Sequence, residues 1–155
     1  MVRPAAVGDV AVILDLIREL ATFEREPDAV RTSEDDLRRA LFGADPEVFA
    51  HVAEQDGAVV GVAVWFVNFS TWTGQHGIFL EDLIIRQSAR GGGHGRALVA
   101  ELARICAERG YRRLDWSVLD WNTDAQRFYR SLGAAPMTEW TGWRLTGGAL
   151  AELTG

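Results

Sequence analysis

Four of the five residues from Gly91 to Gly95 are glycine, and they separate a strand-like segment from a helix-like one. Residues 74–86 are rich in Ile, Leu and Phe, whereas Leu98, Leu102 and Ile105 recur at helical spacing. Because glycine inside a helix is roughly 1 kcal/mol less favourable than alanine, this helix start must need bare backbone. Free N–H groups and the helix dipole attract anions there. The segment therefore predicts a phosphate site.

Three kinds of phosphate-binding loop compete for this segment. The nucleoside-triphosphate loop is excluded because it needs a lysine, and the chain contains none. The dinucleotide pattern G-x-G-x-x-G would start at Gly91 and Gly93, but its third glycine falls on Arg96. What remains is R-G-G-G-H-G, with Arg90 in front of the glycines.

Composition limits the partners. A chain of 155 residues that is 48% hydrophobic has the size of one domain, and we expect residues 1–155 to form one. A net charge of -6 argues against nucleic acid and favours a cationic partner. Apolar runs far shorter than about 20 residues predict no membrane partner, and we expect a cytoplasmic protein.

Cysteine and histidine offer no further chemistry. The single cysteine, Cys106, falls on the apolar side of a helix, so we expect a buried thiol in a reducing compartment. No two of His51, His76 and His94 share the spacing of metal ligands, and we expect no metal.

Hydrophobic spacing predicts an alternating order of elements, and hence an α/β domain with a mixed sheet. The expected helices are Val10–Ala21 with Asp9 as cap, a helix from the capping box Ser33–Asp36 to near Gly43, and Thr123–Leu132. Between the last two, a further helix has Leu98, Leu102, Ile105 and Cys106 on one face and is terminated by Gly110. The first of the other expected strands ends at Pro4. An Asp-Gly turn joins the next two, Val48–Glu54 and Ala58–Asn68, and the last two span Leu114–Val118 and Met137–Leu145.

The loop resembles the pyrophosphate loop of the GNAT superfamily of N-acetyltransferases, [QR]-x-x-G-x-[GA], which holds the diphosphate of coenzyme A. Further stretches resemble the spermidine/spermine (diamine) N-acetyltransferase branch: IRELATFE, FLEDLIIR, DWNTDAQRFYRSLGA and GWRL. The resemblance runs from Arg3 to about Leu145. It implies a GNAT-like mixed central sheet flanked by helices, with splayed central strands at the acetyl-CoA site.

Acetyl transfer to an amine needs a base for the ammonium and an acid for the departing thiolate. The resemblance implies Glu81 as base, acting directly or through water, and Tyr129 as acid. A phenol with a pKa near 10 is protonated at neutral pH and suits that role. Glu81 could instead be a solvated or arginine-paired carboxylate, and Tyr129 a packing aromatic. Asp82 points to the other face of its strand unless a bulge intervenes.

The resemblance also implies acetyl-CoA as co-substrate. Backbone N–H groups of a bulged strand would bind the thioester and pantetheine, and a glycine loop the diphosphate. The residues implied are Leu83, Ile84, Ile85, Arg90, Gly91, Gly92, Gly93, His94, Gly95 and Arg96, completed by Asn122, Thr123, Asp124 and Ala125. Asn122 could equally serve as a helix cap.

Eight positions are implied to bind the amine: Phe23, Glu24, Glu81, Asp82, Asp115, Trp116, Ser117 and Thr141. Tyrosine is usual in the branch where Phe23 stands, and an acidic residue where Thr141 stands. A polyamine, a diamine and a thialysine-like amino acid therefore all stay open as substrates, attacked in a ternary complex. The alternatives are a protein or peptide N-acetyltransferase and a non-catalytic coenzyme A module. The branch is dimeric, and the tryptophan-rich C-terminal segment is compatible with a homodimer surface.

Overall fold

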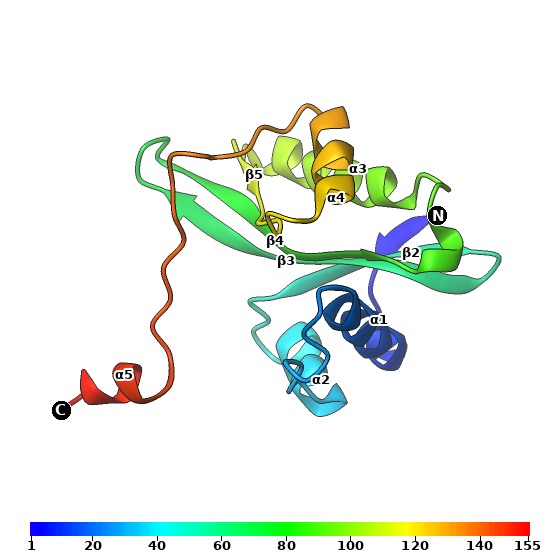
Figure 1. Cartoon of the computed structure of the whole chain (residues 1–155). Helices are drawn as coiled ribbons and strands as arrows, with labels where there is room; N and C mark the ends of the chain where they lie inside the picture. Colours follow the sequence, from blue (N-terminus) through cyan, green and yellow to red (C-terminus); the bar gives the residue numbers. More distant parts are fainter. The chain divides into compact units, whose positions relative to one another are not determined.

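A computed structural model describes all residues from 1 to 155. It divides into two compact units, Met1–Leu119 and Asp120–Gly155. The first unit holds a five-stranded sheet, shown in Figure 1. Its strands are β1 (Val2–Pro4), β2 (Phe49–Gln55), β3 (Ala58–Ser70), β4 (Gln75–Ile85) and β5 (Leu114–Asp115), in that spatial order. Neighbours are antiparallel except β4 and β5, which are parallel, so the sheet is mixed as predicted.

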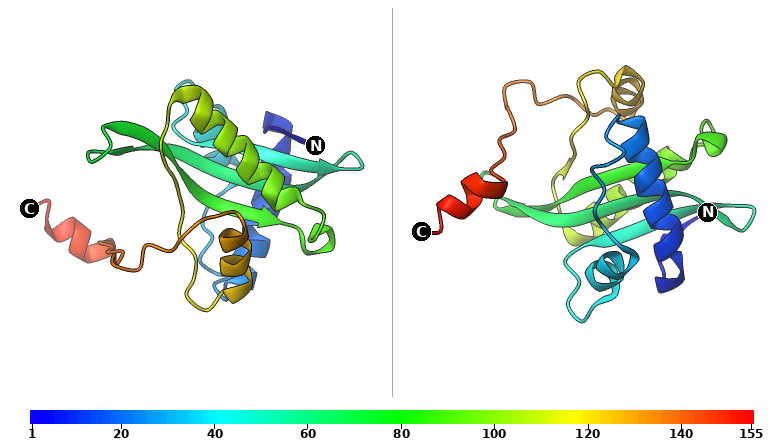
Figure 2. Two further views of the ribbon diagram at one scale, coloured as in Figure 1. Left: turned by 90° about the horizontal axis from the view of Figure 1, so that it is seen from above. Right: turned by 60° about the horizontal axis from the view of Figure 1, so that its bottom comes forward.

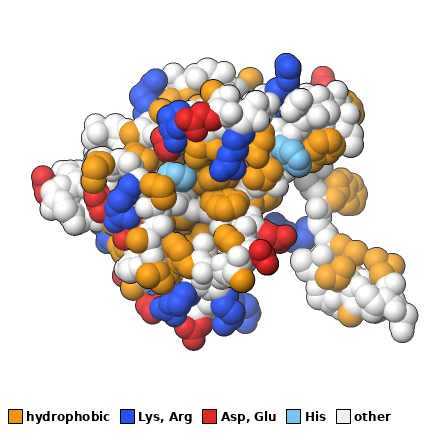
Figure 3. All heavy atoms as spheres, turned by 180° about the vertical axis from the view of Figure 1, so that it is seen from behind, with side chains coloured by type: hydrophobic (Ala, Val, Ile, Leu, Met, Phe, Trp, Pro, Cys, Tyr) orange, Lys and Arg blue, Asp and Glu red, His pale blue; other side chains and the backbone are white.

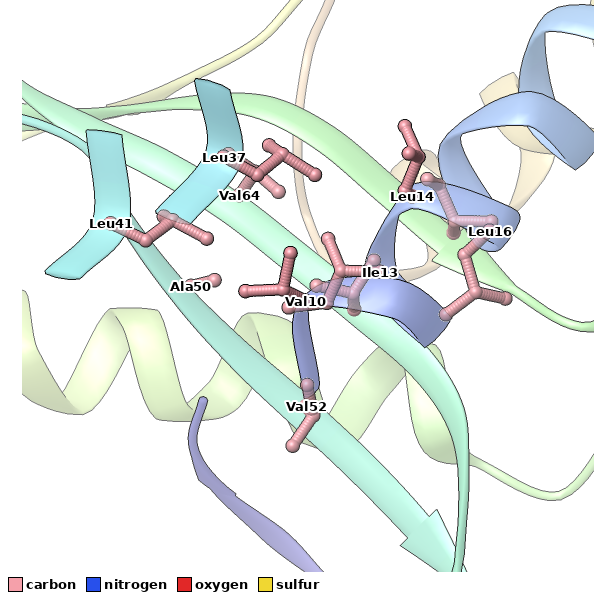
Figure 4. Packing of buried hydrophobic residues seen from close by; sticks show 11 residues of the cluster. Val10, Ile13, Leu14, Leu16, Leu37, Leu41, Ala50, Val52 and Val64 are labelled. Carbon is pink, nitrogen blue, oxygen red and sulfur yellow. The ribbon is translucent and has the colours of Figure 1, made fainter. Parts of the chain in front are cut away.

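Helices cover both faces of this sheet. Two helices, α1 (Val10–Phe23) and α2 (Glu34–Phe42), pack on one face, and α3 (His94–Arg109) lies across the other (Figures 1 and 2). Figure 4 shows side chains of α1, α2 and the strands pointing toward one another in the first of the two cores. The second core, under α3, contains Trp65 and Leu80. A strand between two helical layers presents alternate residues to two different cores.

The start of α1 differs from the expectation. Asp9 occupies the N-cap position as predicted, but its carboxylate makes no capping hydrogen bond to α1, and its dihedrals are helical (φ -86°, ψ -8°) at the end of a short 3₁₀ turn. Its carboxylate accepts a hydrogen bond from the Ala6 N–H (2.7 Å) and pairs with Arg3 (2.7 Å). Arg3 also pairs with Glu54 of β2 (2.6 Å). Asp9 therefore joins the first strand to the helix that follows it.

The capping box of α2 is confirmed. Ser33 Oγ accepts a hydrogen bond from the Asp36 N–H (3.1 Å), and the Asp36 carboxylate accepts one from the Ser33 N–H (3.0 Å). Leu37 and Leu41 are buried as the spacing predicts, and the helix ends before Gly43. Local sequence was sufficient to position this helix.

The predictions for α3 are also confirmed. Its buried face consists of Leu98, Val99, Leu102, Ile105 and Cys106, and Gly110 ends it in the left-handed conformation (φ 70°). Burial raises the pKa of the Cys106 thiol, which fits an unreactive core residue.

The second unit contains α4 (Thr123–Ser131) and a short α5 (Gly147–Glu152). The predicted strand Met137–Leu145 is wrong, since this segment pairs with no other strand and is interrupted by a turn in which Trp140 N–H donates to Met137 O. Strand propensity without a partner ladder does not make a strand. The strand predicted over Leu114–Val118 is shorter, ending at Asp115. No helix in either unit combines the length and apolar character needed to cross a membrane.

Candidate active site

A bulge in β4 lies at Glu81. Trp65 of β3 pairs with Leu80 and Val64 pairs with Asp82, so Glu81 has no partner on β3. Trp65 and Leu80 belong to the core under α3, whereas Val64 belongs to the core under α1. Asp82 therefore faces α1, and so does Glu81, because its side chain alternates with that of Leu80. Without the extra residue, the two carboxylates would lie on opposite faces.

Glu24 adds a third carboxylate at the C-terminal end of α1. Burial, and then the charges of Glu81 and Glu24, raise the pKa of Asp82 to about 6. Burial also raises the pKa of Glu24. None of the nine salt bridges of the chain includes any of these three residues. Elsewhere, several acidic side chains lie directly beside arginine side chains (Figure 3). The three carboxylates lack the counter-charge that a cationic ligand would supply.

The edge of β4 beyond the bulge is open on one side. β5 pairs only with Ile78 and Phe79, so no ladder continues along Leu83 and Ile85. The Arg86 N–H donates to Val60 O of β3 (2.8 Å). Because N–H groups alternate in direction along a strand, those of Ile85 and Leu83 point away from β3, toward the open edge. Leu83, Ile84 and Ile85 are all expected to offer backbone donors. The Ile84 N–H points toward β3, so only those of Leu83 and Ile85 are available at the open edge.

The glycine loop follows β4 directly and begins α3 at His94. Gly91 and Gly93 have left-handed dihedrals (φ 82° and 79°), and a Cβ at either would meet nothing within 4 Å. The first helical bond runs from the Ala97 N–H to Gly93 O (3.0 Å), so the N–H groups of the first turn have no acceptor within the helix. An open glycine cradle against a helix N-terminus fits a diphosphate.

A groove of about 790 Å³ runs between α1 and the end of β4. Its walls include Leu20 and Phe23 from α1, Ile84 and Ile85 from β4, and Arg90 from the loop. The Arg90 guanidinium carbon lies 5.3 Å from the centre of the Phe23 ring. The groove thus brings together Phe23, which is expected to bind the amine, and Ile84, Ile85 and Arg90, which are expected to bind the cofactor.

The second unit carries the other expected cofactor residues and the expected acid. Asn122 caps α4, accepting a hydrogen bond from the Ala125 N–H (3.1 Å). The alternative prediction, that Asn122 serves as a helix cap, is confirmed. Tyr129 lies in the last turn of α4. There Gly133 is left-handed (φ 91°), and the Ala134 N–H donates to Tyr129 O (3.2 Å), which fixes the backbone of Tyr129 through the helix stop.

The remaining predicted positions are distributed over both units. Asp115 is the last residue of β5, Trp116 and Ser117 follow it, and Thr141 lies in the exposed segment after α4. The first three share the first unit with the carboxylates, whereas Thr141 belongs to the second.

Sequence reasoning missed one contact of the loop. His94 Nε2 lies 2.9 Å from Gln55 Oε1, which belongs to the end of β2. The same ring lies over Gly92, where a Cβ would come within 3.0 Å of Nε2. A side chain at Gly92 would therefore require the His94 ring to shift, whereas a Cβ at its two left-handed neighbours would meet no atom. No local signal marks Gln55, because the contact joins residues 39 positions apart.

Comparison with known proteins agrees with this geometry. The acetyltransferase (GNAT) family matches residues 13–134. Thialysine N-epsilon-acetyltransferase of Bos taurus is 39% identical over all of this chain and 97% of its own length. An L-ornithine N5-acetyltransferase of Arabidopsis thaliana is 35% identical over 70% of this chain and 48% of its own. The structure of an integron cassette protein from the mobile metagenome of V. cholerae superposes with a TM-score of 0.82 at 27% identity, over 99% of this chain and 96% of that one.

The chain belongs to the GNAT family of acetyltransferases, and it has the fold of that family. It is an N-acetyltransferase, as the resemblance predicts. GNAT acetyltransferases use acetyl-CoA as co-substrate, and the strand, glycine loop and helix start described above are suited to its diphosphate.

Proposed function

We propose that this protein transfers the acetyl group of acetyl-CoA to a primary amine of a small cationic substrate, by direct attack within a ternary complex. Residues 1–155 act as one GNAT domain in this proposal. The observation that carries it is the group of three carboxylates without an arginine partner: Glu81 and Asp82, which the bulge in β4 places on one face, and Glu24 at the end of α1. A small molecule with one or more ammonium groups supplies the missing charge.

Glu81 is the proposed base. It lies at the bulge itself, is exposed to solvent, and can accept a proton from the ammonium directly or through one water. Loss of that proton frees the nitrogen lone pair for attack on the thioester carbonyl. The Leu83 and Ile85 N–H groups, which point to the open edge of β4, are proposed to donate hydrogen bonds to the carbonyl oxygen as it becomes negative.

Tyr129 is the proposed acid, which protonates the departing thiolate. Its position one turn from the glycine stop of α4 holds its backbone in place. Asn122, Thr123, Asp124 and Ala125, at the start of the same helix, are proposed to bind the pantetheine arm.

Acetyl-CoA supplies the activated acetyl group. Seven consecutive residues of the loop and of the first turn of α3, Arg90 to Arg96, are proposed to hold its diphosphate. The support is the open cradle at Gly91 and Gly93 together with the helix N-terminus.

The substrate is proposed to be the side-chain amine of a lysine-like amino acid or a short diamine, rather than spermidine. Thialysine and L-ornithine, the molecules named for two relatives, both end in a side-chain amine. Phe23 lacks the hydroxyl, and Thr141 the charge, of the residues usual in polyamine-acetylating members. Asp115, Trp116 and Ser117 are proposed to line the amine site with them. We further propose a cytoplasmic homodimer.

The test is turnover of a panel of free amines, read as thiol release from acetyl-CoA, in the wild type and in Tyr129→Phe. We expect acetylation of thialysine, ornithine or a short diamine, and a fall in kcat of about 10²–10⁴-fold in the variant. The matched control is Tyr111→Phe, which changes the other tyrosine of the chain and should leave kcat unchanged.

Each alternative has its own outcome. Activity on peptides but not on free amines would favour a protein N-acetyltransferase. Binding of acetyl-CoA without any acetylated product would favour a non-catalytic module. Unchanged turnover in Tyr129→Phe would remove Tyr129 from the mechanism.

A further inference from the structure

The side chain of Arg90 lies in the groove rather than in the glycine cradle that follows it. Its guanidinium carbon is 5.3 Å from the centre of the Phe23 ring, and its Nε donates to Ile85 O at 3.4 Å. Arg90 makes no salt bridge, although the chain has more acidic than basic residues. The cation of the loop is therefore held by an aromatic face and one backbone carbonyl.

The aromatic face that it occupies belongs to the expected amine site. Phe23 is the last residue of α1 and directly precedes Glu24, one of the three carboxylates beside the bulge. A ring face next to buried negative charge attracts cations in general, not only a guanidinium. Arg90 and a cationic amine would thus compete for the same surface.

A diphosphate would change the balance of this competition. A charge-assisted hydrogen bond between guanidinium and phosphate is stronger than a cation–π contact at an exposed site. Arg90 stands immediately before the glycine cradle, so a diphosphate seated there is within the range of its long side chain.

We propose that Arg90 is a place-holder cation, which covers the Phe23 ring in the absence of acetyl-CoA and leaves it when the diphosphate binds. The ring face then becomes available to the cationic amine, so the amine site is completed only after the cofactor has bound. This inference rests on the proposed function, because it assumes a diphosphate at the loop and an amine near Glu24. By thermodynamic reciprocity, the amine must strengthen coenzyme A binding by the same factor.

The experiment measures the dissociation constant of thialysine by calorimetry, with and without saturating coenzyme A, which carries no acetyl group and allows no turnover. In the wild type, we expect thialysine to bind about 2- to 5-fold more tightly when coenzyme A is present. Phe23→Leu removes the ring face, so the two dissociation constants should become equal. Phe23→Tyr keeps the ring and should keep the coupling.

Arg90→Met should change the affinities for the two ligands in opposite directions. Coenzyme A binding should weaken in this variant, but thialysine alone should bind as tightly as it does to the wild type with coenzyme A. A variant that merely damaged the groove would weaken both ligands. Urea denaturation of each variant checks that its fold is intact, and Arg90→Met keeps the test valid if Phe23→Leu does not fold.

Three results would overturn the inference: equal thialysine affinity with and without coenzyme A in the wild type, no thialysine binding in either state, or coupling that survives in Phe23→Leu. The last would mean that the negative charge of coenzyme A attracts the amine directly. The amine panel separates this failure from that of the proposed function. Turnover without coupling removes only the role of Arg90, whereas absence of any acetylated amine removes the proposed function itself.

Discussion

Two groups of acidic residues in the first unit have opposite surroundings. Asp9 and Glu54 share Arg3, with contacts of 2.7 Å and 2.6 Å, and little of either carboxylate is exposed. Glu24, Glu81 and Asp82 form the other group, which has no arginine partner. The chain has sixteen arginines, so the difference does not reflect a shortage of cations.

The pKa values of Asp9 in the first group and Asp82 in the second move in opposite directions. The hydrogen bond from Arg3 lowers the pKa of Asp9, so this carboxylate stabilises the fold at neutral pH and loses that effect only in strong acid. Burial and neighbouring carboxylates raise the pKa of Asp82 to about 6, so its ionised form opposes folding at neutral pH. The first group stabilises the tertiary structure, whereas the second makes the unliganded protein less stable and more receptive to a cation.

The largest expected effect follows from replacing the proposed base. Glu81→Gln should lower kcat by about 10²–10⁴-fold, because the amide cannot accept the proton of the ammonium. Its free energy of unfolding should not fall, since Glu81 has no ion pair to lose. Steady-state kinetics and urea denaturation measure the two quantities. Glu54→Gln is the matched control, with kcat retained and stability reduced. A loss of stability in Glu81→Gln would break the comparison.

Arg3→Met should have the second largest effect. Two poorly exposed carboxylates, Asp9 and Glu54, would lose their shared counter-charge, and we expect the free energy of unfolding to fall by about 2–4 kcal/mol. In the absence of urea, kcat should be retained, because neither Asp9 nor Glu54 lies at the proposed active site. If kcat fell as far as in Glu81→Gln, the paired group could not be considered purely structural.

Asp82→Asn should stabilise the protein, in a way that depends on pH. Folding raises the pKa of Asp82 from its ordinary 3.8 to about 6, so the folded state binds the extra proton and wild-type stability falls as pH rises through this window. The variant should therefore match the wild type below about pH 4 and exceed it by about 1–3 kcal/mol above pH 6. Urea midpoints measured across pH test this sign.

The same variant should bind the amine less tightly, since it removes one negative charge from the site. A stability difference independent of pH would mean that Asp82 does not titrate in this range. Unchanged KM for the amine would place Asp82 outside the amine site.

The smallest expected effect concerns an ion pair in water. Arg38 contacts Asp35 on α2, and both side chains are largely exposed. Arg38→Gln should change the free energy of unfolding by no more than about 0.5 kcal/mol, because solvent screens such pairs. Urea denaturation of Arg38→Gln and Arg3→Met under the same conditions compares the two losses of stability. Equal losses in the two variants would show that burial does not determine the strength of these pairs.

Local patterns predicted those parts of the fold whose causes are local. The capping box at Ser33, the buried face of α3 and the stop at Gly110 all depend on residues within a few positions of one another. Met137–Leu145 failed as a strand because a strand needs a partner, which its own sequence does not specify. Asp9 makes no capping hydrogen bond to α1 because its carboxylate is engaged by Arg3 and Ala6.

The sequence by itself determined the family, the glycine loop ahead of α3 and the residue types needed for acetyl transfer. Only the tertiary structure decided that Glu81 and Asp82 lie on the same face, because the bulge is a property of the register between β3 and β4. It also decided which acids are paired, since Arg3 and Glu54 are 51 positions apart. Charge in the sequence is a property of each residue, whereas pairing, burial and pKa depend on what folding brings beside it.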